Sequence, residues 1–326
     1  MWLYRDDCSR AFFITQPITI NWRSGRLKVT VQTSIQVESF EFTLEDIHAV
    51  SIDHLHGLSV AVGWPHRVED WQFLLQQGQG IAAVDAIGRV LGSAMWFPMG
   101  EDFATIGMVI TSPRLQTQGT GRWLMGHAQE NLVGRRLGLN STRAAKRLYR
   151  SIGFTPEATV YQCQGEAHLG ETDPLLPPDA ELRDITADDM NDIATLDAAA
   201  YGADRRAWLE KLFALSKGVA LIRENKISAF ALCRPFGRGQ VIGPVVACDD
   251  MDAIAVTKPH VASHQGRFLR LDTREKSGAF ADFLMESGLD LFDTVTTMSM
   301  QGRWADLNNH KTGYAKIFGL ASQALG

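Results

Sequence analysis

The residues of this chain with the clearest chemical potential lie between Ile106 and Phe154. An apolar run ends at Thr111, and the segment Gln116-Thr-Gln-Gly-Thr-Gly121 follows it. Its two glycines allow the backbone to turn with N–H groups facing into the loop and no Cβ in the way. A helix that begins at Gly121 adds unpaired N–H groups and the positive end of its dipole. The loop is therefore suited to a pyrophosphate, although alone it is also typical of an ordinary strand-to-helix turn.

A second motif, Leu148-Tyr-Arg-Ser-Ile-Gly-Phe154, closes a short helix. Thr142 is a suitable N-cap for this helix and Gly153 a suitable C-terminal stop. Tyr149 lies beside the apolar stripe that faces the core. Two interpretations stay open for it from the residues alone: a half-buried aromatic with a satisfied hydroxyl, or a proton donor.

Together the loop and the tyrosine motif resemble the acetyl-coenzyme A binding core of the GNAT N-acetyltransferase superfamily. The resemblance implies acetyl-CoA as co-substrate, no metal, and Tyr149 as the group that protonates the departing thiolate. The commonest family pattern has Asn where this chain has Thr142. Residues implied to hold the co-substrate are Val109, Ile110, Thr111, Gln116, Thr117, Gln118, Gly119, Thr120, Gly121, Arg122 and Thr142.

The implied reaction is direct attack of a primary amine of a small molecule on the acetyl group. Such an amine has a pKa of about 10 and must lose a proton before it attacks. Asp102, just before the cofactor strand, is a candidate general base, acting directly or through water, or else a solvated loop acid. Two alternatives remain: a non-catalytic acyl-CoA sensor or scaffold, which has no use for Tyr149, and a transferase for a longer acyl group.

Four ordered sequence matches predict that the chain contains two copies of one α/β domain. We expect an N-terminal extension at 1–32, a catalytic domain at 33–165, a linker at 166–180 and a degenerate copy at 181–326. Each copy is expected to have a mixed, mostly antiparallel twisted sheet flanked by helices. The matched pairs are 42–47 with 185–190, 80–84 with 218–222, 106–110 with 242–246, and 148–154 with 283–289.

The second copy lacks the chemical residues of the first. Where the first has its glycine loop, the second has Asp249-Asp-Met-Asp-Ala-Ile254, and Leu284 stands in place of Tyr149. Carboxylates at a helix start repel a pyrophosphate. We therefore expect one acetyl-CoA site per chain.

Composition excludes several classes of protein. The 326 residues are 45% hydrophobic and carry a net charge of −5, whereas nucleic-acid binding usually needs a basic face. No apolar run approaches a membrane span, and Arg5, Asp6 and Asp7 stand where a signal peptide needs apolar residues. The four cysteines are widely spaced, which predicts neither a zinc site nor a disulfide framework. We expect a cytoplasmic protein without a nucleic-acid or membrane partner, and a homodimer is left open.

Acceptor recognition is expected from residues 52–71 and from the second copy. The first segment is dense in polar and aromatic residues, typical of a substrate lid or of an ordinary capped helix. We take Trp64, His66 and Glu69 as its candidate substrate contacts. Two docked domains commonly form a small-ligand pocket between them. The candidate contacts from the second copy, each of which is also typical of a surface charge, are Arg234, Arg238, Asp272 and Arg274. Residues 1–32 lie outside the resemblance, and within them 18–22 and 27–31 read as a hairpin. This segment is either a real extension or the product of an upstream start codon.

Overall fold

The structure, a computed structural model, describes residues 34–37, 40–116, 118–170, 176, 179–304 and 315–326. The hairpin predicted in residues 1–32 lies outside them. The first half comprises β1 (Ser34–Val37), β2 (Phe40–Asp46), α1 (Ile52–Ala61), α2 (Val68–Gln77), β3 (Gln79–Asp85), β4 (Val90–Met99), β5 (Phe103–Thr111), the 3-10 helix η1 (Pro113–Leu115), α3 (Thr120–Glu130), β6 (Arg136–Ser141), α4 (Lys146–Ser151) and β7 (Thr155–Glu166).

Apart from the 3-10 helices, the second half repeats the order of elements from β2 to β7 and then adds one strand. It comprises β8 (Glu181–Asp184), the 3-10 helix η2 (Ala187–Asp189), α5 (Met190–Tyr201), α6 (Arg206–Ala214), β9 (Lys217–Arg223), β10 (Lys226–Phe236), β11 (Gly239–Ala247), α7 (Asp250–Ser263), β12 (Phe268–Thr273), α8 (Ala279–Glu286), β13 (Asp290–Met300) and β14 (Lys316–Gly319). Only β5 with β6 and β11 with β12 pair in parallel among the described strands. The predicted fold class, a mixed but mostly antiparallel α/β architecture, is confirmed.

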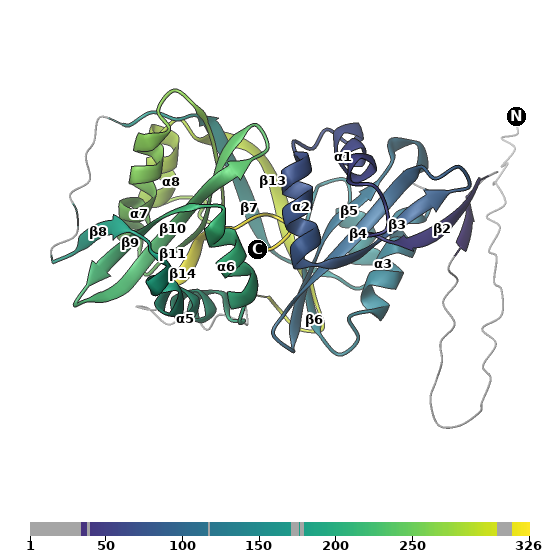
Figure 1. The fold of residues 1–326 in the computed structure, drawn as a ribbon, viewed down its shortest axis with the longest axis horizontal. Helices are drawn as coiled ribbons and strands as arrows, with labels where there is room; N and C mark the ends of the chain where they lie inside the picture. Colours follow the sequence, from purple (N-terminus) through teal and green to yellow (C-terminus); the bar gives the residue numbers. More distant parts are fainter. Residues whose placement is uncertain (1–33, 38–39, 117, 171–175, 177–178, 305–314) are drawn as a thin grey trace, which may run out of the picture. The chain divides into compact units, whose positions relative to one another are not determined.

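The two halves share one continuous sheet because they exchange strands (Figure 1). Its order is β1-β2-β3-β4-β5-β6-β13-β7-β12-β11-β10-β9-β8, with β14 beside β11. Strand β13 of the second half pairs with β6 of the first, and β7 pairs with β12. The expected division at residue 165 into separate sheets therefore differs from the structure. Either partner satisfies the same backbone hydrogen bonds, so the sequence pattern of β7 does not specify which one it takes.

The internal repeat has a more constant offset than the sequence suggested. Glu45 pairs with Ala82, and Arg183 pairs with Ala220, so both first strands correspond at an offset of 138. The sequence match of 42–47 with 185–190 was wrong in register by five residues. Thr186 begins the turn into η2, whereas the first-half segment stays extended up to Asp46. Similar Thr-and-acid composition at a strand and at a helix start produced the false match.

Helices cover the sheet in three groups, each with its own core. Buried side chains of α1, α2, α5 and α6 belong to one hydrophobic cluster that extends through both halves. The cluster beneath α3 and α4 contains Leu132, Tyr149 and Phe154, and also Met298 from the exchanged strand β13. A third cluster lies beneath α7 and α8. The first cluster and the exchanged strands make the described halves one packed unit.

An aromatic trio joins the two halves at the start of β5. The ring of Phe103 lies 5.3 Å from that of Trp304 and 6.3 Å from that of Tyr201. The Tyr201 hydroxyl donates to the Leu325 carbonyl at 3.0 Å, which ties the last residues to α5. Burial of these large rings is a main source of interface stability.

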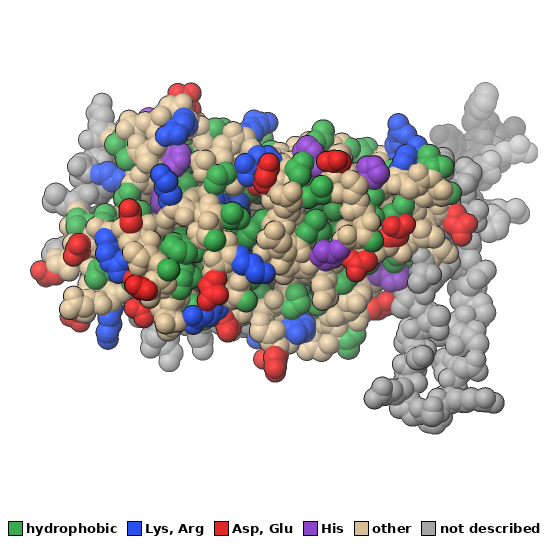
Figure 2. Space-filling view, in the orientation of Figure 1, with side chains coloured by type: hydrophobic (Ala, Val, Ile, Leu, Met, Phe, Trp, Pro, Cys, Tyr) green, Lys and Arg blue, Asp and Glu red, His purple; other side chains and the backbone are tan. Residues whose placement is uncertain are grey.

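On the face shown in Figure 2, acidic and basic side chains are interspersed, and neither sign forms a continuous patch. Among the described helices, none is long and apolar enough to cross a membrane.

Acid should destabilise the fold through the buried His260. Its Nε2 lies 3.2 Å from the Ala231 carbonyl, and burial lowers its pKa to about 4, from 6.5 when unperturbed. The unfolded chain therefore binds a proton below pH 6.5 that the folded chain does not bind until about pH 4. The free energy of unfolding should fall as pH drops through this window, by about 3 kcal/mol from this group.

We expect the variant His260→Gln to show a shallower loss of stability between pH 7 and 4.5 in urea titrations. Glutamine retains an N–H donor toward the Ala231 carbonyl but does not titrate. Equal pH slopes in both proteins would mean that His260 is accessible to protons in the folded state.

Candidate functional site

The first half contains a gap between two parallel strands. Strands β5 and β6 pair only at Phe103–Thr105 with Arg136–Gly138. Beyond that point no described strand pairs with this edge of β5. The other edge of β5 pairs with β4. The register with β4 shifts between Ser93 and Met95, which places one extra residue in β5. Backbone N–H and C=O groups of β5 are thus available to a ligand in the gap.

The extra residue makes a β-bulge at Met108. Met108 has a positive φ of 50°, which is uncommon for a residue with a side chain. The Ser93 hydroxyl, fully buried, donates to the Met108 carbonyl at 2.7 Å and holds the bulge in place. Bulges redirect the backbone and often lie next to active sites. Sequence reasoning missed Ser93, for which no local signal exists.

The glycine loop forms the turn from β5 into α3. Gly119 is the N-cap of α3 with φ 89° and ψ −11°, a left-handed conformation that favours glycine. The helix begins at Thr120, one residue earlier than expected from Gly121. Gln116 Nε2 donates to the Thr111 carbonyl at 3.3 Å, which closes the loop onto the strand. Thr117 lies outside the described residues.

One group in the loop has the character of a binding residue. The Thr120 side chain is fully buried, and its Oγ1 has no hydrogen-bond partner among the described residues. Buried hydroxyls are normally hydrogen-bonded. A hydroxyl and free helix N–H groups at a left-handed turn fit the phosphates of a coenzyme, so the residues present fit acetyl-CoA.

Two contacts bring the glycine loop and the tyrosine motif together. Leu148 Cδ2 lies 3.1 Å from the Cβ position of Gly121. The Arg122 guanidinium donates to the Ser151 hydroxyl at 2.7 Å. Helix α4 therefore packs against the start of α3. Thr142 caps the preceding turn, where its Oγ1 accepts from the Ala145 N–H at 3.4 Å.

Tyr149 is buried on α4, with 6% of its surface exposed. Its ring packs edge-on against Phe154, with centroids 6.1 Å apart. Burial raises the pKa of the phenol, so the hydroxyl keeps its proton at neutral pH. A protonated phenol is the form that a general acid requires.

The equivalent gap in the second half is filled by the chain itself. Strand β14 pairs with β11 at Val245–Ala247, beyond the point where β11 leaves β12. The equivalent helix start is occupied by carboxylates. Asp249 caps α7 by accepting from the Asp252 N–H at 2.9 Å, and Asp252 forms a two-pronged ion pair with Arg223.

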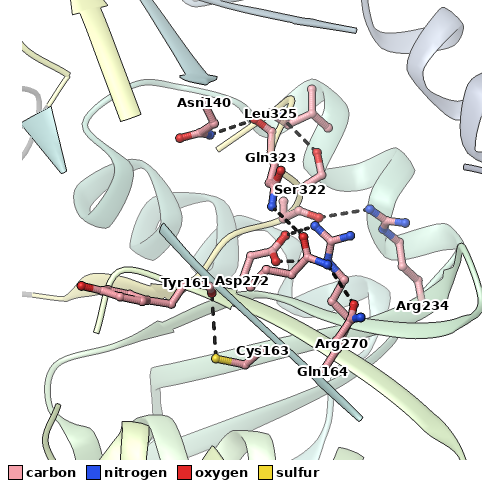
Figure 3. Close-up of polar contacts among 12 residues, drawn as sticks. Asn140, Tyr161, Cys163, Gln164, Arg234, Arg270, Asp272, Ser322, Gln323 and Leu325 are labelled. Atoms are coloured by element: carbon pink, nitrogen blue, oxygen red, sulfur yellow. Dashed lines mark hydrogen bonds and ion pairs between the residues drawn. The ribbon is translucent and has the colours of Figure 1, made fainter. Parts of the chain in front are cut away.

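A cavity of about 360 Å³ lies beside the Met108 bulge and is lined by both halves. The first half contributes the α1–α2 loop, α2, the bulge, the end of β6 and β7. The second half contributes the β10–β11 hairpin, β12, β13 and the segment 322–324. Gly107 allows this last segment to approach, because a Cβ there would lie 2.8 Å from the Cβ of Ala324. Figure 3 shows polar contacts around the cavity, including Asn140 Nδ2 to the Gln323 carbonyl at 2.8 Å.

Several predicted site residues line this cavity. From the first half these are Trp64, His66 and Thr142, and from the second half Arg234 and Arg238. Asp272 and Arg274 are not among the lining residues: Asp272 pairs with the lining residue Arg270 at 2.7 Å, and Arg274 lies over the Trp304 ring.

Two predicted residues lie elsewhere. Glu69 is exposed on the first turn of α2 and is not one of the residues that line the cavity. Asp102 is exposed in the turn before β5, six residues and about 20 Å of strand from the bulge. This distance along an extended strand exceeds the reach of a general base at the bulge, whether it acts directly or through one water, so we do not retain Asp102 as general base.

The lining residues that sequence reasoning missed come from strands β6, β7 and β12, which lie where the two halves exchange strands, and from the last residues. Proximity of the two halves was inferred, but their strand exchange gave no sequence signal. The principal examples are Asn140, Gln162, Gln164, Arg270, Ser322 and Gln323.

Both charged and neutral polar side chains line the cavity. His66 contacts Phe236 edge-on at 5.6 Å, and burial lowers its pKa to about 4, so the imidazole is neutral at pH 7. Three arginines and two aspartates line the space. Outside it, burial raises the pKa of the Cys233 thiol to about 12, which leaves that group unreactive. Among the described residues no cluster of three or more His, Cys, Asp or Glu could hold a metal ion.

Comparison with known proteins agrees with the resemblance of the glycine loop and the tyrosine motif to GNAT acetyltransferases. Family models described as acetyltransferase (GNAT) domain match residues 76–156 and 193–314. The uncharacterized N-acetyltransferase YitH of Bacillus subtilis is 25% identical over 287 residues, which cover 86% of this chain and 97% of that protein.

Solved structures share the fold. A putative acetyltransferase from Pyrococcus horikoshii has a TM-score of 0.69 at 16% identity, and the match covers 87% of this chain and 96% of that one. A tandem GNAT protein from the clavulanic acid biosynthesis pathway has a TM-score of 0.56 at 13% identity, covering 78% and 98%. The chain belongs to the GNAT acetyltransferase family, as a tandem of two such domains.

Proposed function

We propose that this protein transfers an acetyl group from acetyl-CoA to a primary amine of a small molecule. The observation that carries the proposal is the cavity beside the Met108 bulge, which adjoins the gap between β5 and β6. The coenzyme would be held by the loop 116–121 and by the free edge of β5, and it would supply the acetyl thioester. The amine would occupy the cavity between the two halves.

Each proposed role follows from a local feature of the chain. Backbone N–H groups near the bulge would polarise the acetyl carbonyl, in the manner of an oxyanion hole. Tyr149, kept protonated by burial, would hydrogen-bond or protonate the thiolate, whose parent thiol has a pKa of about 8.5. The described cysteines have thiol pKa values raised by burial and are not needed as nucleophiles.

The cavity would also favour the reactive form of the acceptor. Its lining holds more arginines than aspartates, and His66 is neutral at pH 7. Nearby positive charge disfavours an ammonium ion relative to the free amine. The acceptor would therefore lose its proton more readily than in water.

The deciding experiment is an amine panel with acetyl-CoA, in which release of free thiol is measured. Turnover of at least one amine supports the transferase. Acetyl-CoA binding without release of free thiol in the presence of any amine would instead favour an acyl-CoA sensor. Turnover only with longer acyl thioesters would show that the protein transfers a longer acyl group.

Acetyl-CoA should bind once per chain, and Gly119→Glu should weaken it by about tenfold or more. The substitution places a side chain in a left-handed turn and a negative charge at the helix start that would face the phosphates. Titration calorimetry gives both the stoichiometry and the affinity. Gly126→Glu, with the same added charge inside α3 and open space around its Cβ position, is the matched control and should bind normally. Two equivalent sites per chain, or unchanged affinity in Gly119→Glu, would contradict this prediction.

A further inference from the structure

The buried arginines of this protein differ in whether a carboxylate pairs with them. Arg205 forms a two-pronged ion pair with Asp197 at 2.6 and 2.8 Å. Arg270 forms one with Asp272 at 3.0 and 2.7 Å. Arg234, only 5% exposed, has no carboxylate within ion-pair distance in the part of the chain that the structure describes.

The Arg234 guanidinium meets only neutral acceptors. Its Nη2 donates to the Ala321 carbonyl at 3.0 Å, and Nη1 makes a longer contact of 3.4 Å with the Pro235 carbonyl. Its Nε is buried without a hydrogen-bond partner. Since a guanidinium has five N–H donors, most of its capacity is unused. Figure 3 shows the side chain reaching from β10 toward the last residues of the chain.

The lining carboxylate that acts electrostatically on Arg234 is Asp70, and it is already engaged. Asp70 accepts from Arg67 Nε and Nη2 at 3.1 and 2.8 Å, and from the backbone N–H groups of Arg67 and Gly237 at 2.8 and 3.0 Å. It therefore has little capacity left for Arg234. Burial lowers the pKa of Arg234 to about 10, so the group remains charged at neutral pH although its charge is poorly compensated.

A buried charge without a partner is costly, and proteins normally pair such groups. Arg234 lines the same cavity as the bulge, and the rings of Phe73 and Phe236 flank it at 5.6 and 5.1 Å. The missing partner must come from outside the described chain. The cavity therefore combines an anion site, an apolar wall and the reaction centre.

We propose that the acceptor amine also carries a carboxylate, which Arg234 binds with its two-pronged guanidinium while the amine faces the bulge. The acceptor would thus be a small amino acid or a related amino acid derivative. This inference rests on the proposed acetyltransferase function and assigns its substrate class.

The test compares amines that differ only in the carboxylate. Suitable pairs are lysine with 1,5-diaminopentane and phenylalanine with 2-phenylethylamine, and aminomethylphosphonate against glycine separates carboxylate from phosphonate recognition. Wild-type kcat/KM should be higher for the acid of a pair. In Arg234→Gln that preference should fall by at least about 30-fold, mainly through KM. Arg234→Lys keeps the charge but loses the fork, and should give an intermediate loss.

The matched control is Arg267→Gln, which removes an exposed arginine that also donates to a backbone carbonyl, that of Ser263. It should keep the wild-type preference. Equal or better turnover of the decarboxylated amines by the wild type would overturn the inference while leaving the transferase intact. The inference would also be overturned if both Arg234 variants had the melting temperature of the wild type and kept its preference for the acids over the decarboxylated amines.

Calorimetry without acetyl-CoA separates this inference from the proposed function. If no amine releases thiol, binding of the acids to the wild type and its loss in Arg234→Gln would still support the anion site. Absence of acid binding to the wild type would reject it.

Discussion

Replacing Tyr149 by Phe should lower kcat by about 100-fold, while the affinity for acetyl-CoA stays nearly constant. The substitution removes one hydroxyl and retains the ring that packs against Phe154 in the core beneath α3 and α4. Burial keeps this phenol protonated well above neutral pH, so the lost group is a proton donor. Steady-state kinetics with the best amine of the panel gives kcat, and titration calorimetry gives the affinity.

Tyr161→Phe is the control for the loss of a hydroxyl. Tyr161 lies half-buried on β7 and is not one of the residues that line the cavity. This variant should turn over at the wild-type rate. Full turnover of Tyr149→Phe at neutral pH would show that Tyr149 only packs and that the thiolate leaves unaided.

A chain that ends after Glu166 should fail to fold, with complete loss of activity. Strand β7 takes its partners, β12 and β13, from the second half, and β6 also pairs with β13. The truncated chain would leave β7 without either partner and an edge of β6 open. Open edges of this kind favour aggregation. The fragment would also lose Tyr201 and Trp304, against which Phe103 packs.

The experiment is to express residues 34–166 alone and together with residues 181–326. We expect the single fragment to be insoluble or to unfold without a cooperative transition, as followed by circular dichroism. Co-expression should restore a soluble complex, because the strand exchange needs both pieces but not the peptide bonds between them. A soluble 34–166 fragment that unfolds cooperatively and binds acetyl-CoA would contradict the prediction.

The backbone turns of the two motifs in the first half were predictable because their signals are local. A left-handed turn needs Gly119, and a helix stop needs Gly153, so both appear in the sequence at fixed places. The positions of Trp64 and His66 followed from the helix-start composition around them. Such features depend on the backbone conformation of a few neighbouring residues.

The assembly of the site was decided by tertiary structure. Strand exchange, the bulge held by Ser93 and the approach of Ala324 to Gly107 involve residues far apart in the chain. The sequence pattern of a strand is compatible with more than one partner strand. Only the packing of the folded chain decides which partner it takes.

For the charged residues too, the sequence showed where charge occurs, and the tertiary structure decided its surroundings. The sequence named Arg234 as one of four equal candidates and Asp102 as a base, because it shows charge but not burial. The fold leaves Asp102 in solvent at the far end of β5 and encloses Arg234 without a carboxylate. The sequence alone therefore determined that the chain has two related domains and one glycine loop. The tertiary structure alone decided which charges face the cavity, because desolvation and pairing depend on neighbours that only folding brings together.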